Sequence, residues 1–349
     1  IYIPGDKSLS IRFVLLASMA IGKSSAYNIL KSADLMSSLK AIYKLGINYR
    51  IKKNLCEIYG KGLNGFKFKN NTIINAGNSG TLARLIFGLL INSKNTVILK
   101  GDKSLSKRDF SRVIKPLKLF GVNIKCKNNS LPIEITGTKF LRPITYDENI
   151  GSAQVKSCII LSALNTPGTT IINSKISRNH TELMLKSLNY PIKVQKKGQV
   201  DKIFINGLKQ FKSFEYNVPG DISSASFFIV LTLLSKKSRI TIEGVNVNKS
   251  RIGIIQILNK MGASIKLKNK KLYKGEEVAD IHVRSIAKLN SINCPSKLNS
   301  SAIDEFLIIF LVAARAKGVS YFKNLEELNQ KESQRLNWGS KILNKMFNL

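Results

Sequence analysis

Five short runs of small and polar residues open directly into apolar helices, and their residue types suit the binding of phosphate and carboxylate groups. The runs begin at Gly5-Asp6-Lys7-Ser8, Gly77-Asn78-Ser79-Gly80, Gly151-Ser152-Ala153-Gln154, Gly220-Asp221-Ile222-Ser223 and, more loosely, Ser301-Ala302-Ile303-Asp304. A helix start leaves backbone N–H groups unpaired and carries the positive end of the helix dipole. In a single run these residues are ordinary N-caps, but five runs with different polar residues favour a binding surface.

The helix starts also carry side chains that bind anions, and their spacing excludes a common nucleotide-binding loop. The candidates are Lys7, Ser8, Arg12, Ser79, Ser152, Gln154 and Lys156. Asp6 separates Gly5 from Lys7, and Ala17 stands where a P-loop ending at Lys23 needs glycine. Neither segment is therefore a Walker motif.

The elements that position these residues repeat along the chain. From start to start the runs lie 72, 74, 69 and 81 residues apart, which suits a small copied α/β unit. Each run is followed by a second helix pattern that leads, in three cases through a glycine cap, into a β-rich segment. These patterns cover Leu39–Ile47, Val113–Ile124, Leu183–Val194 and Ile254–Leu267, and a fifth spans Arg335–Met346. We expect two helices and several strands in each unit.

Length and composition indicate a folded protein of about two domains. The 349 residues are 44% hydrophobic, and no long uncharged apolar stretch indicates a membrane span. The four cysteines include no Cys-x-x-Cys pair, so we expect no metal site and no disulfide framework. Because the chain opens on Ile1 without a methionine and stops at Leu349 inside a repeat, we expect a fragment truncated at both ends that lacks a sixth unit.

The formal net charge of +35 comes mostly from lysines that are spread along the chain. Together with abundant Asn and Ile, this composition is typical of an AT-rich genome. No basic tail, RNP-like aromatic pattern or helix-turn-helix signature accompanies the charge. We therefore expect no specific nucleic-acid partner, although part of the charge can serve an anionic substrate.

Six motifs in order along the chain carry a resemblance to a known family. They are Pro4 to Arg12, Asn75 to Thr81, Gly151 to Lys156, Ser177 to Glu182, Val218 to Asp221, and Lys331 to Arg335. The set resembles the enolpyruvyl transferases, in particular the 5-enolpyruvylshikimate-3-phosphate synthases of class II. The resemblance implies a two-domain α/β fold built from repeated units as an inside-out barrel. It places residues 7–221 in one domain and residues 1–6 with 222–349 in the other.

The resemblance also implies a reaction. In that family the enolpyruvyl group of phosphoenolpyruvate is transferred to the 5-hydroxyl of shikimate 3-phosphate, and phosphate is released, on the route to chorismate and the aromatic amino acids. It implies a monomer in the bacterial cytoplasm that needs no metal and no organic cofactor. The substrates are then two small anions, with no membrane partner.

The resemblance carries over residue by residue. It implies catalytic roles for Lys7, for Asp304 as the base at the hydroxyl, and for Glu332 as the proton donor. The positions matching shikimate 3-phosphate binding are Lys7, Ser8, Arg12, Ser152, Ala153, Gln154, Ser177, Arg178, Asp304 and Lys331. The positions matching phosphoenolpyruvate binding are Lys7, Gly80, Arg108, Gln154 and Arg335.

Departures from the family pattern keep alternatives open. Ile11 replaces a usual His, Asn329 a usual Arg, and Gln334 a usual Asp. The last two departures weaken the charge network around Glu332 and Arg335. One alternative is a UDP-N-acetylglucosamine enolpyruvyl transferase, although the reactive loop cysteine of that group is not evident. The other is an inactive basic remnant that binds polyanions. Some class II members tolerate glyphosate, and the sequence leaves that property open here.

We expect the chain to gain stability if it is extended at its C-terminus by one more repeat, about 70 to 90 residues. The added unit should cover an exposed sheet edge and an open core. Thermal melting of the two forms measures this, and equal melting temperatures would contradict it.

Overall fold

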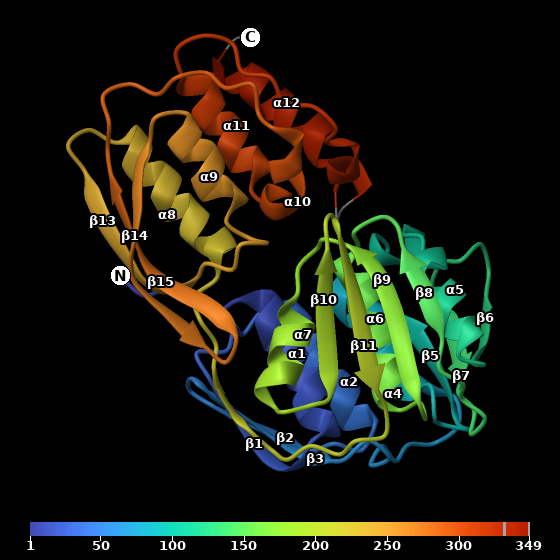
Figure 1. Ribbon diagram of the computed structural model, residues 1–349. Coiled ribbons are helices and arrows are strands. Elements are labelled where there is room, and N and C mark those ends of the chain that lie inside the picture. The colour runs from blue at the N-terminus through green and yellow to red at the C-terminus, as the bar shows by residue number, and fades with distance from the viewer. Residues whose placement is uncertain (331–332, 348–349) are drawn as a thin grey trace. The chain divides into compact units, whose positions relative to one another are not determined.

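The computed structural model describes residues 1–330 and 333–347 and divides them into two compact units (Figure 1). Unit 1 contains Ile1–Asp6 and Pro219–Leu349, and unit 2 contains Lys7–Val218. Both units mix helices with sheets.

Unit 2 is built from three copies of one α/β motif. Its helices are α1 (Lys7–Met19), α2 (Ala33–Lys44), α3 (Gly80–Leu85), α4 (Phe87–Leu90), α5 (Ser111–Leu119), α6 (Ala153–Leu164) and α7 (His180–Ser187), with a 3₁₀ turn at Leu105–Lys107. Its strands are β1 (Ile21–Tyr27), β2 (Tyr49–Lys52), β3 (Leu55–Lys61), β4 (Thr72–Asn75), β5 (Thr96–Lys100), β6 (Asn123–Cys126), β7 (Ile133–Thr136), β8 (Thr145–Glu148), β9 (Thr169–Lys175), β10 (Ile192–Lys197), β11 (Val200–Asn206) and β12 (Glu215–Asn217).

The three sheets of unit 2 share one topology. Their strand orders are β12-β1-β3-β2, β4-β5-β7-β6 and β8-β9-β11-β10, and the last can be followed in Figure 1. In each sheet the first pair is parallel and the other two pairs are antiparallel. In the second and third sheets the buried helix crosses between the two parallel strands, whereas β12 from the end of the unit completes the first. The copied unit predicted from the sequence is confirmed.

Two kinds of helix serve different purposes in unit 2. Helices α1 and α6 are buried almost throughout, together with polar residues such as Arg12 and Lys156, and α3 contacts both helices. Helices α2 and α5 are amphipathic and bury one face only. The first kind therefore forms the core, and its N-terminal turns are fixed by packing.

The expected glycine caps are confirmed in three repeats and replaced in one. Gly46, Gly121 and Gly262 follow their helices with φ values of +87°, +100° and +94°. A Cβ on Gly46 would lie 2.5 Å from the backbone oxygen of Lys67, so a side chain has no room there. After α7, Asn189 takes the left-handed position with φ of +55°, because Asn tolerates this conformation.

Unit 1 has a smaller sheet covered by helices. Its strands β13 (Arg239–Asn246), β14 (Ser264–Tyr273) and β15 (Glu276–Arg284) are antiparallel in the order β13-β15-β14. Its helices are α8 (Ile222–Leu234), α9 (Gly253–Lys260), α10 (Asn299–Ala302), α11 (Phe306–Arg315) and α12 (Arg335–Phe347), with 3₁₀ turns at Ser296–Leu298 and Glu326–Gln330. None of the helices in the described ranges is long and apolar enough to span a bilayer.

The fifth helix start differs from the sequence prediction. The pattern beginning at Ser301 predicted one helix, whereas α10 begins at Asn299 and the helical path breaks before α11 begins at Phe306. Asp304 lies within this break, followed by Glu305, whose carboxylate accepts a hydrogen bond from the Ser223 hydroxyl. The break thus places two carboxylates between two short helices.

Unit 1 leaves part of its apolar helix surface exposed. Phe227 and Leu231 on α8 are 66% and 64% exposed, and Trp338 and Ile342 on α12 are also exposed. Residues spaced by four lie on one face of a helix. Each helix therefore presents an apolar stripe.

A buried arginine joins the two chain segments of unit 1. The segment ending at Asp6 runs beside the segment starting at Pro219, with a 2.8 Å hydrogen bond from the Asp6 amide to the Pro219 oxygen. The guanidinium of Arg251 lies 3.3 Å from Asp6, 3.5 Å from Asp221 and 4.0 Å from Glu305. Burial opposes the charge, but the attraction of these carboxylates outweighs it and raises the pKa of Arg251 above its ordinary value.

Replacing Arg251 by Met should cost unit 1 about 3 to 5 kcal/mol of unfolding free energy, because buried carboxylates then lose their shared cation. Urea denaturation measures the loss. Lys249→Met is the matched control, since its 3.8 Å contact with Glu277 is exposed and should be worth less than about 0.5 kcal/mol. Similar losses in both variants would contradict the central role of Arg251.

Candidate functional site

The N-terminal turns of α1, α3 and α6 meet in unit 2. Ser79 and Ser152 cap α3 and α6, and their hydroxyl oxygens accept hydrogen bonds from the amides of Leu82 and Val155 at 3.2 and 3.4 Å. The side chain of Gln154 donates to the Thr81 hydroxyl at 3.2 Å, which joins the first turns of α6 and α3. The structure therefore brings the first turns of α3 and α6 together.

Arg12 on α1 is a buried, hydrogen-bonded cation. Its Nε donates to Thr181 Oγ1 at 2.9 Å, its Nη2 to Ser157 Oγ at 3.1 Å and its Nη1 to the backbone oxygen of Ser8 at 3.1 Å. The two hydroxyls are hydrogen-bonded to each other at 2.8 Å. Arg12 is only 4% exposed, so its charge lies in a weakly screened environment where anion binding is strong.

Lys7 and Ser8 begin α1 and are more accessible. The Lys7 ammonium lies 3.3 Å from Asp34, and its side chain is 46% exposed. Ser8 is half-buried and holds Arg12 through its backbone oxygen. Lys7 therefore presents a partly exposed charge and Arg12 a buried one on the same helix.

The loop between β9 and α7 supplies Ser177 and Arg178. Ser177 is buried, and within the described residues its hydroxyl has no hydrogen-bond partner. Buried polar groups are almost always satisfied, so this hydroxyl is suited to a ligand. Ala153 is the first residue of α6 and offers its backbone N–H at the helix start.

A second cation, Arg108, is positioned beside Gly80. Asp102 accepts from the Leu105 amide and the Asn78 side chain, and these hydrogen bonds lower the pKa of Asp102. Because the Asn78 amide nitrogen donates to Asp102, its oxygen faces Arg108 and accepts from Nη2 at 3.1 Å. A Cβ on Gly80 would lie 2.8 Å from Arg108 Nη1, so only glycine lets the guanidinium lie this close to the helix start.

In unit 1 the structure joins two of the predicted residues. The Arg335 guanidinium at the start of α12 lies 3.3 Å from the Asp304 carboxylate, and both side chains are about one-quarter exposed, at 21% and 26%. This contact fixes the direction of the carboxylate. The predicted positions Lys331 and Glu332 lie outside the described residues.

Several residues that support the site were not singled out from the sequence. Asn78 and Asp102 hold Arg108, and Ser157 and Thr181 hold Arg12. Asn78 and Thr181 lie inside the motifs, and Ser157 lies directly after one. A polar residue so close to a helix start could have been predicted to support the site. Asp102 had no such signal, because it acts through contacts made only in the folded unit.

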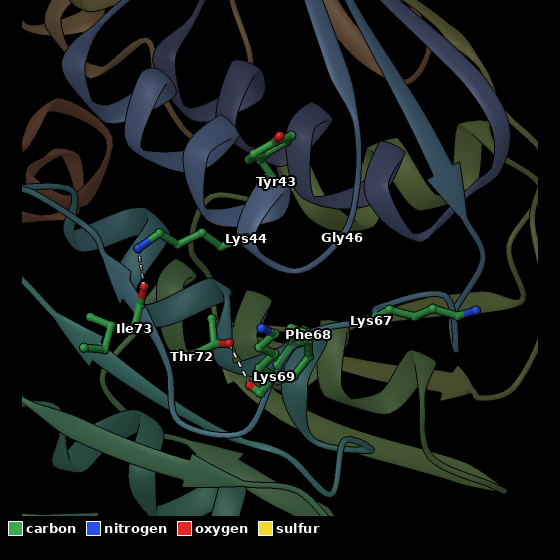
Figure 2. A pocket seen from close by; sticks show the side chains of 8 residues that line it. All are labelled: Tyr43, Lys44, Gly46, Lys67, Phe68, Lys69, Thr72 and Ile73. Carbon is green, nitrogen blue, oxygen red and sulfur yellow. Dashed lines mark hydrogen bonds between the residues drawn. The ribbon is translucent and has the colours of Figure 1, made fainter.

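A separate surface pocket lies elsewhere in unit 2 and shares no residue with these groups. Its volume is about 470 Å³, and Figure 2 shows its lining by the end of α2 and the segment around Lys67 and Lys69. The Lys44 ammonium donates across it to the Ile73 oxygen at 2.7 Å. In the described part of the chain, no group of three His, Cys, Asp or Glu could hold a metal ion.

Comparisons with known proteins agree with this geometry. The profile of the family described as EPSP synthase (3-phosphoshikimate 1-carboxyvinyltransferase) matches residues 1–347. The 3-phosphoshikimate 1-carboxyvinyltransferase of Ruthia magnifica subsp. Calyptogena magnifica is 44% identical over 335 residues, which are 96% of this chain and 76% of the relative. The EPSP synthase structure from Acinetobacter baumannii is 35% identical with a TM-score of 0.86, covering 98% of this chain and 76% of that chain.

A more distant structure shows the fold alone. The enolpyruvyl transferase NikO from Streptomyces tendae has a TM-score of 0.70 at 13% identity, covering 91% of this chain and 73% of that chain. With the closer match, it shows the mixed α/β two-domain fold of the enolpyruvyl transferases. The fold class inferred from the motifs is confirmed, although no closed barrel is seen.

The cysteines of the native chain should differ strongly in reactivity. Burial raises the pKa of Cys56 and of Cys158, which follows Ser157 on α6, to about 12, so both stay protonated thiols at pH 8. With iodoacetamide we expect half-buried Cys126 to be alkylated first and Cys56 and Cys158 only after unfolding, as mapped by mass spectrometry. Rapid alkylation of native Cys158 would show a thiolate at the site.

Proposed function

The chain belongs to the EPSP synthase family, and we propose that it transfers the enolpyruvyl group of phosphoenolpyruvate to the 5-hydroxyl of shikimate 3-phosphate. The observation that carries the proposal is the set of helix starts around Arg12. It combines three N-terminal turns, a buried guanidinium and capping serines in one small region of unit 2. Such a region binds a compact anion with several charges better than a long polyanion.

In the proposal, shikimate 3-phosphate lies against α1 and α6. Arg12, Lys7 and Ser8 hold it from α1, and Ser152, Ala153 and Gln154 hold it from the start of α6. Ser152 uses its oxygen in the cap, so its hydroxyl proton can still donate to the phosphate. Ser177 and Arg178 add contacts from the loop before α7. The buried Ser177 hydroxyl then gains the partner it needs.

Phosphoenolpyruvate lies near Arg108 in the proposal. The Asp102–Asn78 chain aims Arg108, and Gly80 leaves the space in which a carboxylate or phosphate can approach its planar fork. Lys7 and Gln154 also contact this substrate in the proposal, and the family resemblance alone assigns Arg335 to it. Arg335 also lies 3.3 Å from Asp304, so in the proposal it orients the base as well as the substrate.

The reaction needs one proton taken and one proton given. The 5-hydroxyl oxygen attacks the central carbon of phosphoenolpyruvate as Asp304 takes the hydroxyl proton, and Glu332 gives a proton to the methylene carbon. A proton then leaves the resulting methyl group as the C–O bond to phosphate breaks, which restores the double bond. Cations around the phosphates stabilise the negative charge throughout. The roles of Glu332 and Lys331 rest on the sequence motif alone.

The family resemblance further supports a monomer in the bacterial cytoplasm that works without an organic cofactor. The rival transfer to a UDP-N-acetylglucosamine acceptor has less support. Cys56 and Cys158 are buried with raised pKa values, and no cysteine takes part in the anion site of the described unit 2. The helix starts also fit a small phosphorylated acceptor.

A phosphate-release assay with both substrates tests the proposal. We expect release that requires shikimate 3-phosphate and does not occur with UDP-N-acetylglucosamine. Arg108→Met should raise the KM for phosphoenolpyruvate about 10- to 100-fold, since a charged hydrogen-bond donor to an anion is lost. Arg142→Met is the matched control, because Arg142 is an exposed arginine of the same unit and should leave KM unchanged. Release without acceptor dependence, or equal KM values, would contradict the proposal.

A further inference from the structure

Helices α6 and α7 are joined by a buried ion pair that no step of the reaction uses. The Lys156 ammonium lies 2.8 Å from the Glu182 carboxylate, and the two side chains are 0% and 3% exposed. Glu182 lies in the first turn of α7, where the helix dipole stabilises a carboxylate. Lys156 lies near the start of α6, where the helix dipole destabilises an ammonium group. The stability of α6 alone therefore does not account for a lysine at this position.

The ion pair lies beside the two hydroxyls that hold Arg12. Ser157 follows Lys156 on α6, and Thr181 precedes Glu182 on α7. The hydroxyls lie 2.8 Å apart, and each accepts one hydrogen bond from the guanidinium. Both acceptors must stay at their present spacing for the guanidinium to meet them at the same time. The distance between the starts of α6 and α7 therefore sets the orientation of Arg12.

A buried ion pair adds little stability compared with apolar side chains of the same size, because both charges lose their hydration. What the pair does is hold the backbone of α6 at a fixed distance from the backbone of α7. Here those backbones also carry Ser152 to Gln154 before one partner and Ser177 and Arg178 before the other. All of these residues bind shikimate 3-phosphate in the proposed function.

We propose that Lys156 and Glu182 are positioning residues for shikimate 3-phosphate, which hold the starts of α6 and α7 at the spacing that orients Arg12. The inference rests on the proposed function, because it concerns the same substrate. The pair itself touches no substrate. It acts through Ser157 and Thr181.

The test replaces both charges by side chains of similar size, Lys156→Met with Glu182→Met. Calorimetric titration measures the Kd for shikimate 3-phosphate, and thermal melting measures stability. We expect a melting temperature equal to or above that of the parent and a Kd raised about tenfold. A purely structural pair would leave the Kd unchanged. Lys156→Gln with Glu182→Gln keeps a hydrogen bond and provides the same comparison if the Met variant does not fold.

A variant cycle shows whether the pair acts through Arg12. Thr181→Val removes one hydroxyl with little change of shape and should raise the Kd about tenfold. Adding the double Met replacement to Thr181→Val should raise the Kd by less than about twofold more, because coupled residues are not additive. If the two replacements acted independently, the Kd would rise about a hundredfold in the combined variant. That result would show that the ion pair does not act through Thr181 and Arg12.

The pair Lys23–Glu57 of unit 2, at 3.0 Å with side chains 55% and 13% exposed, is the matched control, and replacing both residues by Met should leave the Kd unchanged. Equal Kd values for the parent and the double Met variant would overturn this inference alone. Failure of the folded parent to bind shikimate 3-phosphate would overturn the proposed function and the inference with it.

Discussion

The burial of one guanidinium, that of Arg12, is the constraint on which the rest of unit 2 depends. A buried cation is costly unless its N–H groups find acceptors, and Arg12 finds them on its own helix, on α6 and on α7. Those partners are 4, 145 and 169 residues away in sequence. They meet only if the first and third repeats pack through their central helices. The folding of the unit and the assembly of its anion site are therefore one event.

Unit 1 also contains a buried arginine, but there the carboxylates outnumber the guanidinium. There one guanidinium, that of Arg251, faces three carboxylates and the Ser223 hydroxyl. Two of these carboxylates belong to the separate chain segments that enter the unit, and the third neighbours Asp304. Arg251 thus connects the two segments that contain Asp6 and Asp221 to Glu305, in the break between α10 and α11. A local network of this kind positions a carboxylate without any long helix to carry it.

Local patterns in the sequence predicted the elements well and their partners poorly. Small polar residues ahead of apolar helices identified the starts of α1, α3, α6 and α8, and Gly46, Gly121 and Gly262 identified helix ends. These features depend on neighbouring residues. The break around Asp304 was missed because Glu305 is held by the Ser223 hydroxyl and the Arg251 guanidinium, which are distant in the sequence. The support of Arg108 by Asp102 and of Arg12 by Thr181 was missed because each depends on contacts between distant segments.

The central claim is that the helix starts of unit 2 form a specific site for a small phosphorylated acid. The most direct measurement is calorimetric titration of the folded chain with shikimate 3-phosphate, with shikimate as the comparison, at two salt concentrations. We predict one saturable site in the micromolar range, with shikimate at least about tenfold weaker because it lacks the charge that the cations meet. Salt should weaken the affinity far less than the roughly thousandfold loss typical of binding to nucleic acid. Absence of saturable binding, or equal affinity for shikimate, would contradict the account.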